Sequence, residues 1–134
     1  MNAVYLHELY FANIGDVSSE IMQDNLSYMR LARDFGTFDD WQRDFLACAM
    51  SAREGWAICG YNTFLRRFVN VVIDLHDTSV PVGLYPVAVI DCWNHAMPVG
   101  APRRDYVIAM MRELNWEVID NRVKRADRIA EALK

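Results

Sequence analysis

Three runs rich in β-branched and aromatic residues stand next to one another in the middle of the chain, with helical patterns before and after them. The runs are GWAICGY (55–61), FLRRFVNVVIDL (64–75) and YPVAVID (85–91), and polar turns separate them. Because the three runs follow one another without helices between them, we expect them to pair as an antiparallel sheet. The sequence therefore predicts an α+β fold with amino-terminal helices, a three-stranded antiparallel sheet and carboxyl-terminal helices.

Helical spacing of apolar residues predicts two helices near the start of the chain. The first covers residues 3–13 and is expected to stop at Gly15. The second is expected to begin at Ser18 or Ser19, because either side chain can cap the amino end of a helix. It is expected to end near Phe35, just before a glycine.

A third helix is predicted to begin in TFDD (37–40), where a threonine precedes an acidic residue by three positions, the pattern of a capping box. Its apolar face is expected to consist of Trp41, Phe45, Leu46 and Met50. After the strands, helices are expected from Arg103 to Leu114 and from Trp116 onward. These two helices form the predicted carboxyl-terminal part of the fold.

Length, charge and cysteine content narrow the class of protein. The 134 residues fit a single domain over 1–134, with a helical part at 1–53 and an α/β part at 54–134. A net charge of −4 argues against a nucleic-acid partner, and no apolar run reaches the length of a membrane span. The three cysteines form no CxxC pair, so we expect free thiols and a cytoplasmic location.

The stretch DCWNH begins where the third predicted strand ends. Asp91 and His95 lie four residues apart, so one helical turn after the strand would place both side chains on the same side. A carboxylate and an imidazole together suit a first-row transition metal. The alternative is an aspartate that caps a turn beside a half-buried histidine, and the spacing alone leaves both alternatives open.

The residues around this stretch resemble the iron/manganese superoxide dismutase family. DCWNHAM, followed by RRDYVIAMMRELNWEVIDNR, resembles the family's D-x-W-x-H-A-Y motif and the R-R-x-D-Y-V and N-W-x-x-V segments after it. Upstream, DFGTFDDWQRDFLACAMSAREGWAIC and LHELYFANIG resemble the family's D-F-G-S-F stretch and its second ligand-bearing helix. These segments stand in the family's order and extend over essentially the whole chain.

The resemblance implies a mononuclear iron or manganese centre that converts superoxide into oxygen and hydrogen peroxide. His7, Asp91 and His95 match the family's metal ligands. Trp93 matches the tryptophan of the metal pocket, and Trp56 matches the aromatic residue where the sheet begins. We therefore expect the catalytic site to combine these side chains with His76 and an arginine at position 103 or 104.

Two further elements of the implied site are less closely defined. His76 stands where family members place a glutamine or histidine that hydrogen-bonds the metal-bound solvent. It would lie beside the metal, coordinate it directly, or be a plain polar turn residue after a strand. Either Arg103 or Arg104 matches the arginine that attracts the superoxide anion into the site.

Three other residues have competing roles. Phe11 and Trp41 would line the site or belong to the ordinary hydrophobic core, and the core is the expected place for both. Cys92 stands next to Asp91, but the family position carries no ligand role. We therefore expect Cys92 to be a buried thiol.

The sequence departs from the family pattern in places that bear on assembly. The family's first helix, which carries a ligand histidine, has no counterpart, and Asn94 replaces the glutamate that crosses the family's dimer interface. Met97 and Pro98 replace the tyrosines that follow H-A in the family. We expect a homo-oligomer or a subunit of a larger complex, formed differently from the family dimer. The alternative function is a non-catalytic subunit with the superoxide dismutase fold.

Overall fold

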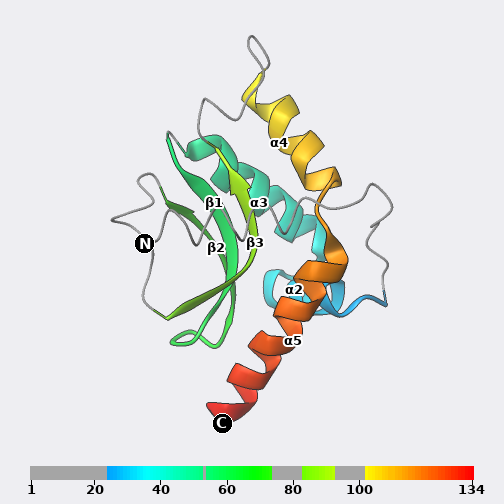
Figure 1. Cartoon of the computed structure of the whole chain (residues 1–134), viewed down its shortest axis with the longest axis vertical. Coiled ribbons are helices and arrows are strands. Elements are labelled where there is room, and N and C mark those ends of the chain that lie inside the picture. The colour runs from blue at the N-terminus through cyan, green and yellow to red at the C-terminus, as the bar shows by residue number, and fades with distance from the viewer. Residues whose placement is uncertain (1–23, 53, 74–82, 93–101) are drawn as a thin grey trace.

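The computed structural model describes residues 24–52, 54–73, 83–92 and 102–134 (Figure 1). The predicted helix at 3–13 and its stop at Gly15 lie outside the described residues. Within the described part, no helix is both long enough and apolar enough to cross a membrane. The α+β fold predicted from the sequence is confirmed by the four helices and the three-stranded antiparallel sheet that the described residues form.

The sheet has the strand order β2-β1-β3, with β1 at Trp56–Asn62, β2 at Arg67–Ile73 and β3 at Leu84–Asp91. Both outer strands pair antiparallel with the central strand β1, so β2 and β3 run parallel to each other. As a result, the carboxyl ends of β2 and β3 and the amino end of β1 meet at one edge of the sheet. This edge positions the candidate site.

The second strand is shorter than predicted, because Phe64, Leu65 and Arg66 form the turn of a hairpin. The Asn62 side chain accepts hydrogen bonds from the backbone N–H groups of Phe64 and Leu65, each at 2.9 Å. Arg66 has a φ of 56°, in the left-handed region that a tight turn requires. The prediction that the strand begins at Phe64 was wrong, because local turn geometry outweighs the strand propensity of two apolar residues.

The pairing of β3 with β1 contains a bulge. Cys59 pairs with Ala88 and the next residue of β1, Gly60, pairs with Pro86, so Val87 is an extra residue on β3. A proline has no backbone N–H, and it is tolerated on an outer strand and at such an irregularity. The bulge therefore accommodates Pro86 without removing a hydrogen bond from a regular ladder.

Gly60 and Arg122 fit the surrounding structure to the bulge. A Cβ added at Gly60 would lie 2.8 Å from the carbonyl oxygen of Tyr85, so only glycine fits there. The guanidinium of Arg122, a buried residue of the last helix, donates a hydrogen bond of 3.2 Å to the Val87 carbonyl oxygen. The irregular part of β3 is thus held by a buried side chain.

The first described helix, α2 (Leu26–Phe35), begins later than predicted. Asn25 is extended, with φ −67° and ψ 139°, and its side chain accepts a hydrogen bond from the Tyr28 N–H. The prediction of one helix from Ser18 or Ser19 was therefore wrong, because a second capping residue lies inside the expected span. The predicted end is confirmed, since Gly36 follows with a φ of 100°.

The next helix, α3 (Phe38–Ser51), begins as predicted, and the Thr37 side chain accepts a hydrogen bond of 3.0 Å from the Asp40 N–H. Trp41 and Phe45 are fully buried and Leu46 is partly buried, but Met50 is 40% exposed. The placement of Met50 on the buried face was wrong. Met50 is nine residues from Trp41, and nine steps of 100° put it on the opposite side of the helix.

The carboxyl-terminal helices are α4 (Arg103–Arg112) and α5 (Trp116–Ala132), which confirms the two predicted helices. The helix α4 ends two residues before the expected Leu114. Figure 1 shows α5 running alongside the sheet down to the carboxyl terminus, with α4 near the edge where β3 ends. The Asn115 side chain caps α5 by accepting hydrogen bonds from the N–H groups of its first turn.

The two faces of the sheet have separate hydrophobic clusters. Helices α2, α3 and α5 pack on one face, where the aromatic rings of Phe38, Trp41, Phe45 and Trp116 contact one another. The opposite face carries a smaller cluster of fully buried side chains, Trp56, Ile58, Ile73 and Val89. The smaller cluster lies at the edge of the sheet described above.

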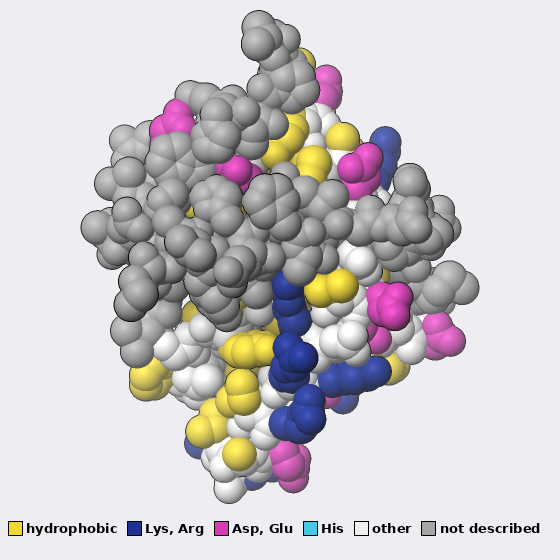
Figure 2. Space-filling view, in the orientation of Figure 1, with side chains coloured by type: hydrophobic (Ala, Val, Ile, Leu, Met, Phe, Trp, Pro, Cys, Tyr) yellow, Lys and Arg dark blue, Asp and Glu magenta, His cyan; other side chains and the backbone are white. Residues whose placement is uncertain are grey.

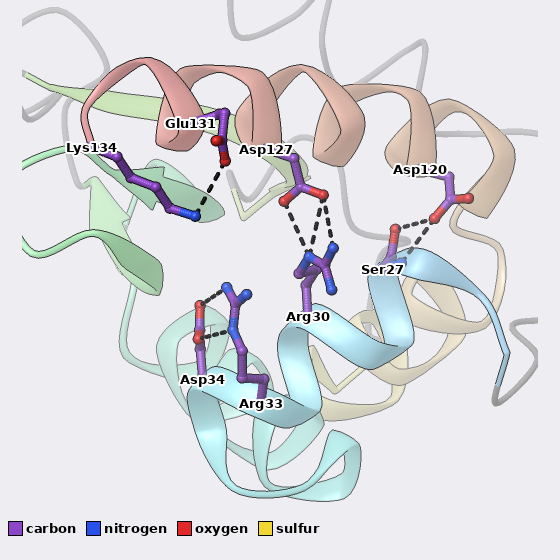
Figure 3. Close-up of polar contacts among 8 residues, drawn as sticks. All are labelled: Ser27, Arg30, Arg33, Asp34, Asp120, Asp127, Glu131 and Lys134. Atoms are coloured by element: carbon purple, nitrogen blue, oxygen red, sulfur yellow. Dashed lines mark hydrogen bonds and ion pairs between the residues drawn. The ribbon is translucent and has the colours of Figure 1, made fainter.

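Polar contacts join α2 to α5 across more than ninety residues of sequence (Figure 3). The Asp120 carboxylate accepts hydrogen bonds from the Ser27 hydroxyl at 2.7 Å and the Ser27 N–H at 2.9 Å. About two turns further along α5, Asp127 pairs with Arg30 at 3.1 Å. These contacts fix the first described helix against the last one.

Candidate metal centre

The ends of three strands meet at one edge of the sheet, and two of these ends carry predicted site residues. Trp56, the first residue of β1, pairs with Ile73 at the end of β2 and with Asp91 at the end of β3. In sequence, His76 follows Ile73 by three residues, and His95 follows Asp91 by four. The topology therefore directs two predicted ligand-bearing segments away from the same edge.

The structure describes only part of the predicted site. His7, His76, Trp93 and His95 lie outside the described residues, as does Phe11. Asp91, Trp56, Arg103 and Arg104 are described. Among the described residues, no three His, Cys, Asp or Glu side chains lie together in a group that could hold an ion. The predicted ligand set therefore stays a prediction.

Asp91 is a buried residue at the end of β3, next to the small apolar cluster. It is 4% exposed, and the alternation of β3 places its side chain on the same face as Val89. Its partner on β1 is the fully buried Trp56. Burial of a carboxylate is costly unless hydrogen bonds or a cation compensate for its charge, and carboxylate oxygen is a ligand that both manganese and iron accept. The chemistry and position of Asp91 therefore fit a metal ligand.

The backbone at Asp91 is fixed by two hydrogen bonds. The Tyr106 hydroxyl of α4 donates to the Asp91 carbonyl oxygen at 3.0 Å. The Cys92 N–H, which belongs to the same peptide group, donates to the Gly55 carbonyl oxygen at 2.8 Å. Sequence reasoning gave Tyr106 no role, because nothing in its local pattern indicates that its hydroxyl reaches a strand fifteen residues earlier.

The two candidate arginines have different environments. Arg103 is half-buried at the start of α4, and its guanidinium donates to the carbonyl oxygens of Ala49 and Ala52 at the end of α3. Such carbonyls have no partner within their own helix, so an arginine is a favourable donor for them. Arg104 is exposed. Which of the two attracts an anion to the site stays a prediction.

Cys92 is confirmed as a buried thiol. It is 1% exposed, and its Sγ–H donates to the Ile90 carbonyl oxygen at 3.7 Å. Burial raises the pKa of Cys92 to about 12. Since the thiolate, not the thiol, is the metal-binding form, these surroundings do not favour a ligand role.

The two described tryptophans named in the sequence prediction lie on opposite faces of the sheet. Trp41 is confirmed as core, because its ring stacks on Phe45 with centroids 5.2 Å apart and its Nε1–H donates to Asn70 at 3.0 Å. Trp56 belongs instead to the small cluster beside Asp91. Of these two described tryptophans, Trp56 is the one that lies next to Asp91.

A cavity of about 460 Å³ lies at the other end of the sheet. Its lining includes Tyr61 near the end of β1, with Arg33, Asp34 and Arg66. Tyr61 is five residues from Trp56, which corresponds to roughly 16 Å along a strand. Arg33 forms an ion pair with Asp34 at 2.7 Å within this lining. The cavity is therefore separate from the edge that holds Asp91.

Basic side chains also gather on the surface. Figure 2 shows Lys and Arg side chains in a column on the lower half of the visible face, with hydrophobic and acidic side chains beside it. On α5, the exposed basic residues Lys124, Arg125 and Arg128 lie between the exposed acidic residues Glu117 and Glu131. The expectation of no nucleic-acid partner stays a prediction.

Comparison with known proteins identifies the family. Residues 23–122 match the family described as iron/manganese superoxide dismutases, C-terminal domain. The chain is 31% identical over 128 residues to superoxide dismutase [Mn] 2 of Haloferax volcanii, covering 94% of this chain and 63% of that protein. It is 34% identical over 138 residues to superoxide dismutase [Fe] of Aquifex pyrophilus, covering 98% of this chain and 62% of that protein. The chain thus spans just under two thirds of the length of these relatives, and it belongs to the iron/manganese superoxide dismutase family.

Proposed function

We propose that this chain binds one iron or manganese ion through His7, Asp91 and His95 and dismutates superoxide. The observation that carries the proposal is the buried carboxylate of Asp91 at the end of β3, beside Trp56, in a chain of this family. The named relatives are manganese or iron enzymes, which supports either metal here. The ion would supply a one-electron redox couple.

The net reaction balances two superoxide anions and two protons against one O₂ and one H₂O₂. One superoxide loses an electron and the other gains it, so the reaction needs no other oxidant or reductant. The contribution of this chain is to hold the ligands, exclude water and attract the anion. The apolar cluster of Trp56, Ile73 and Val89, which adjoins Asp91 through Trp56, would keep bulk water from the carboxylate.

Several other residues and properties belong to the same proposal. His76 would donate a hydrogen bond beside the metal or coordinate it as a fourth ligand, and Trp93 would form a wall of the pocket. Arg103 or Arg104 would attract superoxide. We further propose a cytoplasmic location, supported by three free cysteines. A homo-oligomer or a place in a larger complex completes the proposal.

The test is the metal content and activity of three proteins expressed in medium that contains both metals. We expect about one ion per chain in the wild type and in Asp39→Ala, a control at an exposed aspartate of α3. Asp91→Ala should lose the ion and the activity, because a buried ligand is removed. A wild-type protein without iron or manganese would refute the proposal. A bound ion without dismutation would refute its catalytic part.

A further inference from the structure

The peptide group that follows Asp91 is held from both of its sides. Its carbonyl oxygen accepts the hydrogen bond from the Tyr106 hydroxyl at 3.0 Å, and its N–H, on Cys92, donates to Gly55 at 2.8 Å. In a planar trans peptide, the C=O and the N–H point in opposite directions. The two hydrogen bonds therefore resist rotation of this peptide in either sense.

This peptide joins two parts of the proposed metal centre. Its first residue is Asp91, and the chain that leaves it carries Trp93 and His95. Rotation of the peptide would change the backbone angle ψ of Asp91 and the direction in which the following residues depart. A small change in that direction would alter the position of His95 relative to the carboxylate of Asp91.

The hydroxyl donor is itself fixed by surrounding structure. Tyr106 lies in the first turn of α4, one residue before the fully buried Val107. Three residues earlier, Arg103 joins α4 to α3 through the carbonyl oxygens of Ala49 and Ala52. Helix α4 is thus held by the core and by α3, so it delivers the hydroxyl at a defined position.

We propose that Tyr106 is a positioning residue that fixes the peptide after Asp91 and so sets the geometry of the metal centre. The inference rests on the proposed function, because it concerns a metal held by Asp91 and His95. Tyr106 acts through the backbone carbonyl oxygen of Asp91. Its hydrogen bond comes from a side chain, so a substitution can remove it, unlike the backbone contact at Gly55.

The experiment compares wild type, Tyr106→Phe and the control Tyr28→Phe with added Mn²⁺. Tyr28→Phe removes the hydroxyl of another half-buried tyrosine, which lies in α2 and whose ring stacks on Phe38 of α3. We expect Mn²⁺ affinity, measured by competition with a chelator, to fall about tenfold in Tyr106→Phe and to stay within about twofold in the control. At saturating Mn²⁺, the electron paramagnetic resonance spectrum should change in Tyr106→Phe only.

The outcomes separate this inference from the proposed function. A wild type that binds no Mn²⁺ and no iron would refute both. A wild type that binds Mn²⁺ with a Tyr106→Phe variant of unchanged affinity and spectrum would overturn only the role of Tyr106. If Tyr106→Phe does not fold, 3-fluorotyrosine at position 106 keeps the ring and strengthens the donor. The spectrum should then change while the fold is retained, and an unchanged spectrum would overturn the inference.

Discussion

The two contacts between α2 and α5 should differ strongly in their effect on stability, although both involve an aspartate of α5. Asp120 accepts two hydrogen bonds from Ser27, which is fully buried in the first turn of α2. Asp127 pairs with Arg30, but the two side chains are 32% and 31% exposed. Buried polar groups that lose a partner cost far more than exposed ion pairs, so Asp120 should matter more.

The expected magnitudes follow from the number of contacts and their burial. Asp120→Ala leaves the N–H and the hydroxyl of Ser27 without their acceptor, and at about 1–2 kcal/mol each this lowers the free energy of unfolding by about 2–4 kcal/mol. The charge of Asp120 near the amino end of α2 adds a smaller contribution of the same sign. Asp127→Ala removes a partly exposed pair, which solvent screening limits to about 0.5–1 kcal/mol.

The assay is urea unfolding followed by circular dichroism, with metal-free protein throughout, because a bound ion would stabilise the folded state by mass action. Asp120→Ala should also lower the melting temperature by about 10 °C, and Asp127→Ala by less than about 4 °C. A double-mutant cycle with Ser27→Ala should recover at least about 1 kcal/mol of coupling to Asp120. Equal losses for the two aspartate variants, or a larger loss for Asp127→Ala, would refute the reasoning.

Three other predictions concern the site, the thiols and the assembly. His76→Ala should lose the metal if His76 is a ligand, or keep it with an altered redox potential if His76 lies beside it; no change in either would exclude both roles. Burial raises the pKa of the Cys59 thiol from 9.0 to about 12. The neutral thiol therefore stabilises the folded state fully below about pH 9, and this stabilisation is lost as the pH rises toward 12. Urea unfolding at pH 8 and pH 10.5 should therefore show a smaller loss of stability in Cys59→Ala than in wild type. Analytical ultracentrifugation at micromolar concentration should show an oligomer, and a clean monomer would contradict that expectation.

Most of the fold could be predicted from the sequence because local signals agree with the tertiary structure. The β-branched runs became β1, β2 and β3, and Thr37 caps α3 as its spacing from Asp40 indicates. The errors arose where one local signal competed with another. Asn25 provides a later cap than Ser18 or Ser19, and the hairpin turn after Asn62 takes apolar residues that a strand would also accept.

The site was less predictable, because its geometry depends on contacts between distant segments. The sequence places Asp91 at the end of a strand, but the pairing of Asp91 with Trp56 follows only from the register of the sheet. The hydrogen bond from Tyr106 depends on how α4 packs, which no local pattern encodes. The positions of His7, His76 and His95 stay predictions, since they lie outside the described residues.

The bulge at Val87 has a consequence for the lengths that this strand can tolerate in related sequences. Between Ala88 and Asp91, successive side chains alternate between the two faces of the sheet. One residue inserted there would turn the Asp91 carboxylate to the face that α3 and α5 cover. At the bulge itself, the extra residue Val87 can be lost while the pairing of Asp91 with Trp56 is kept. Insertions and deletions within this strand in relatives should therefore fall at or before Val87, and the three-residue spacing from Ala88 to Asp91 should be constant.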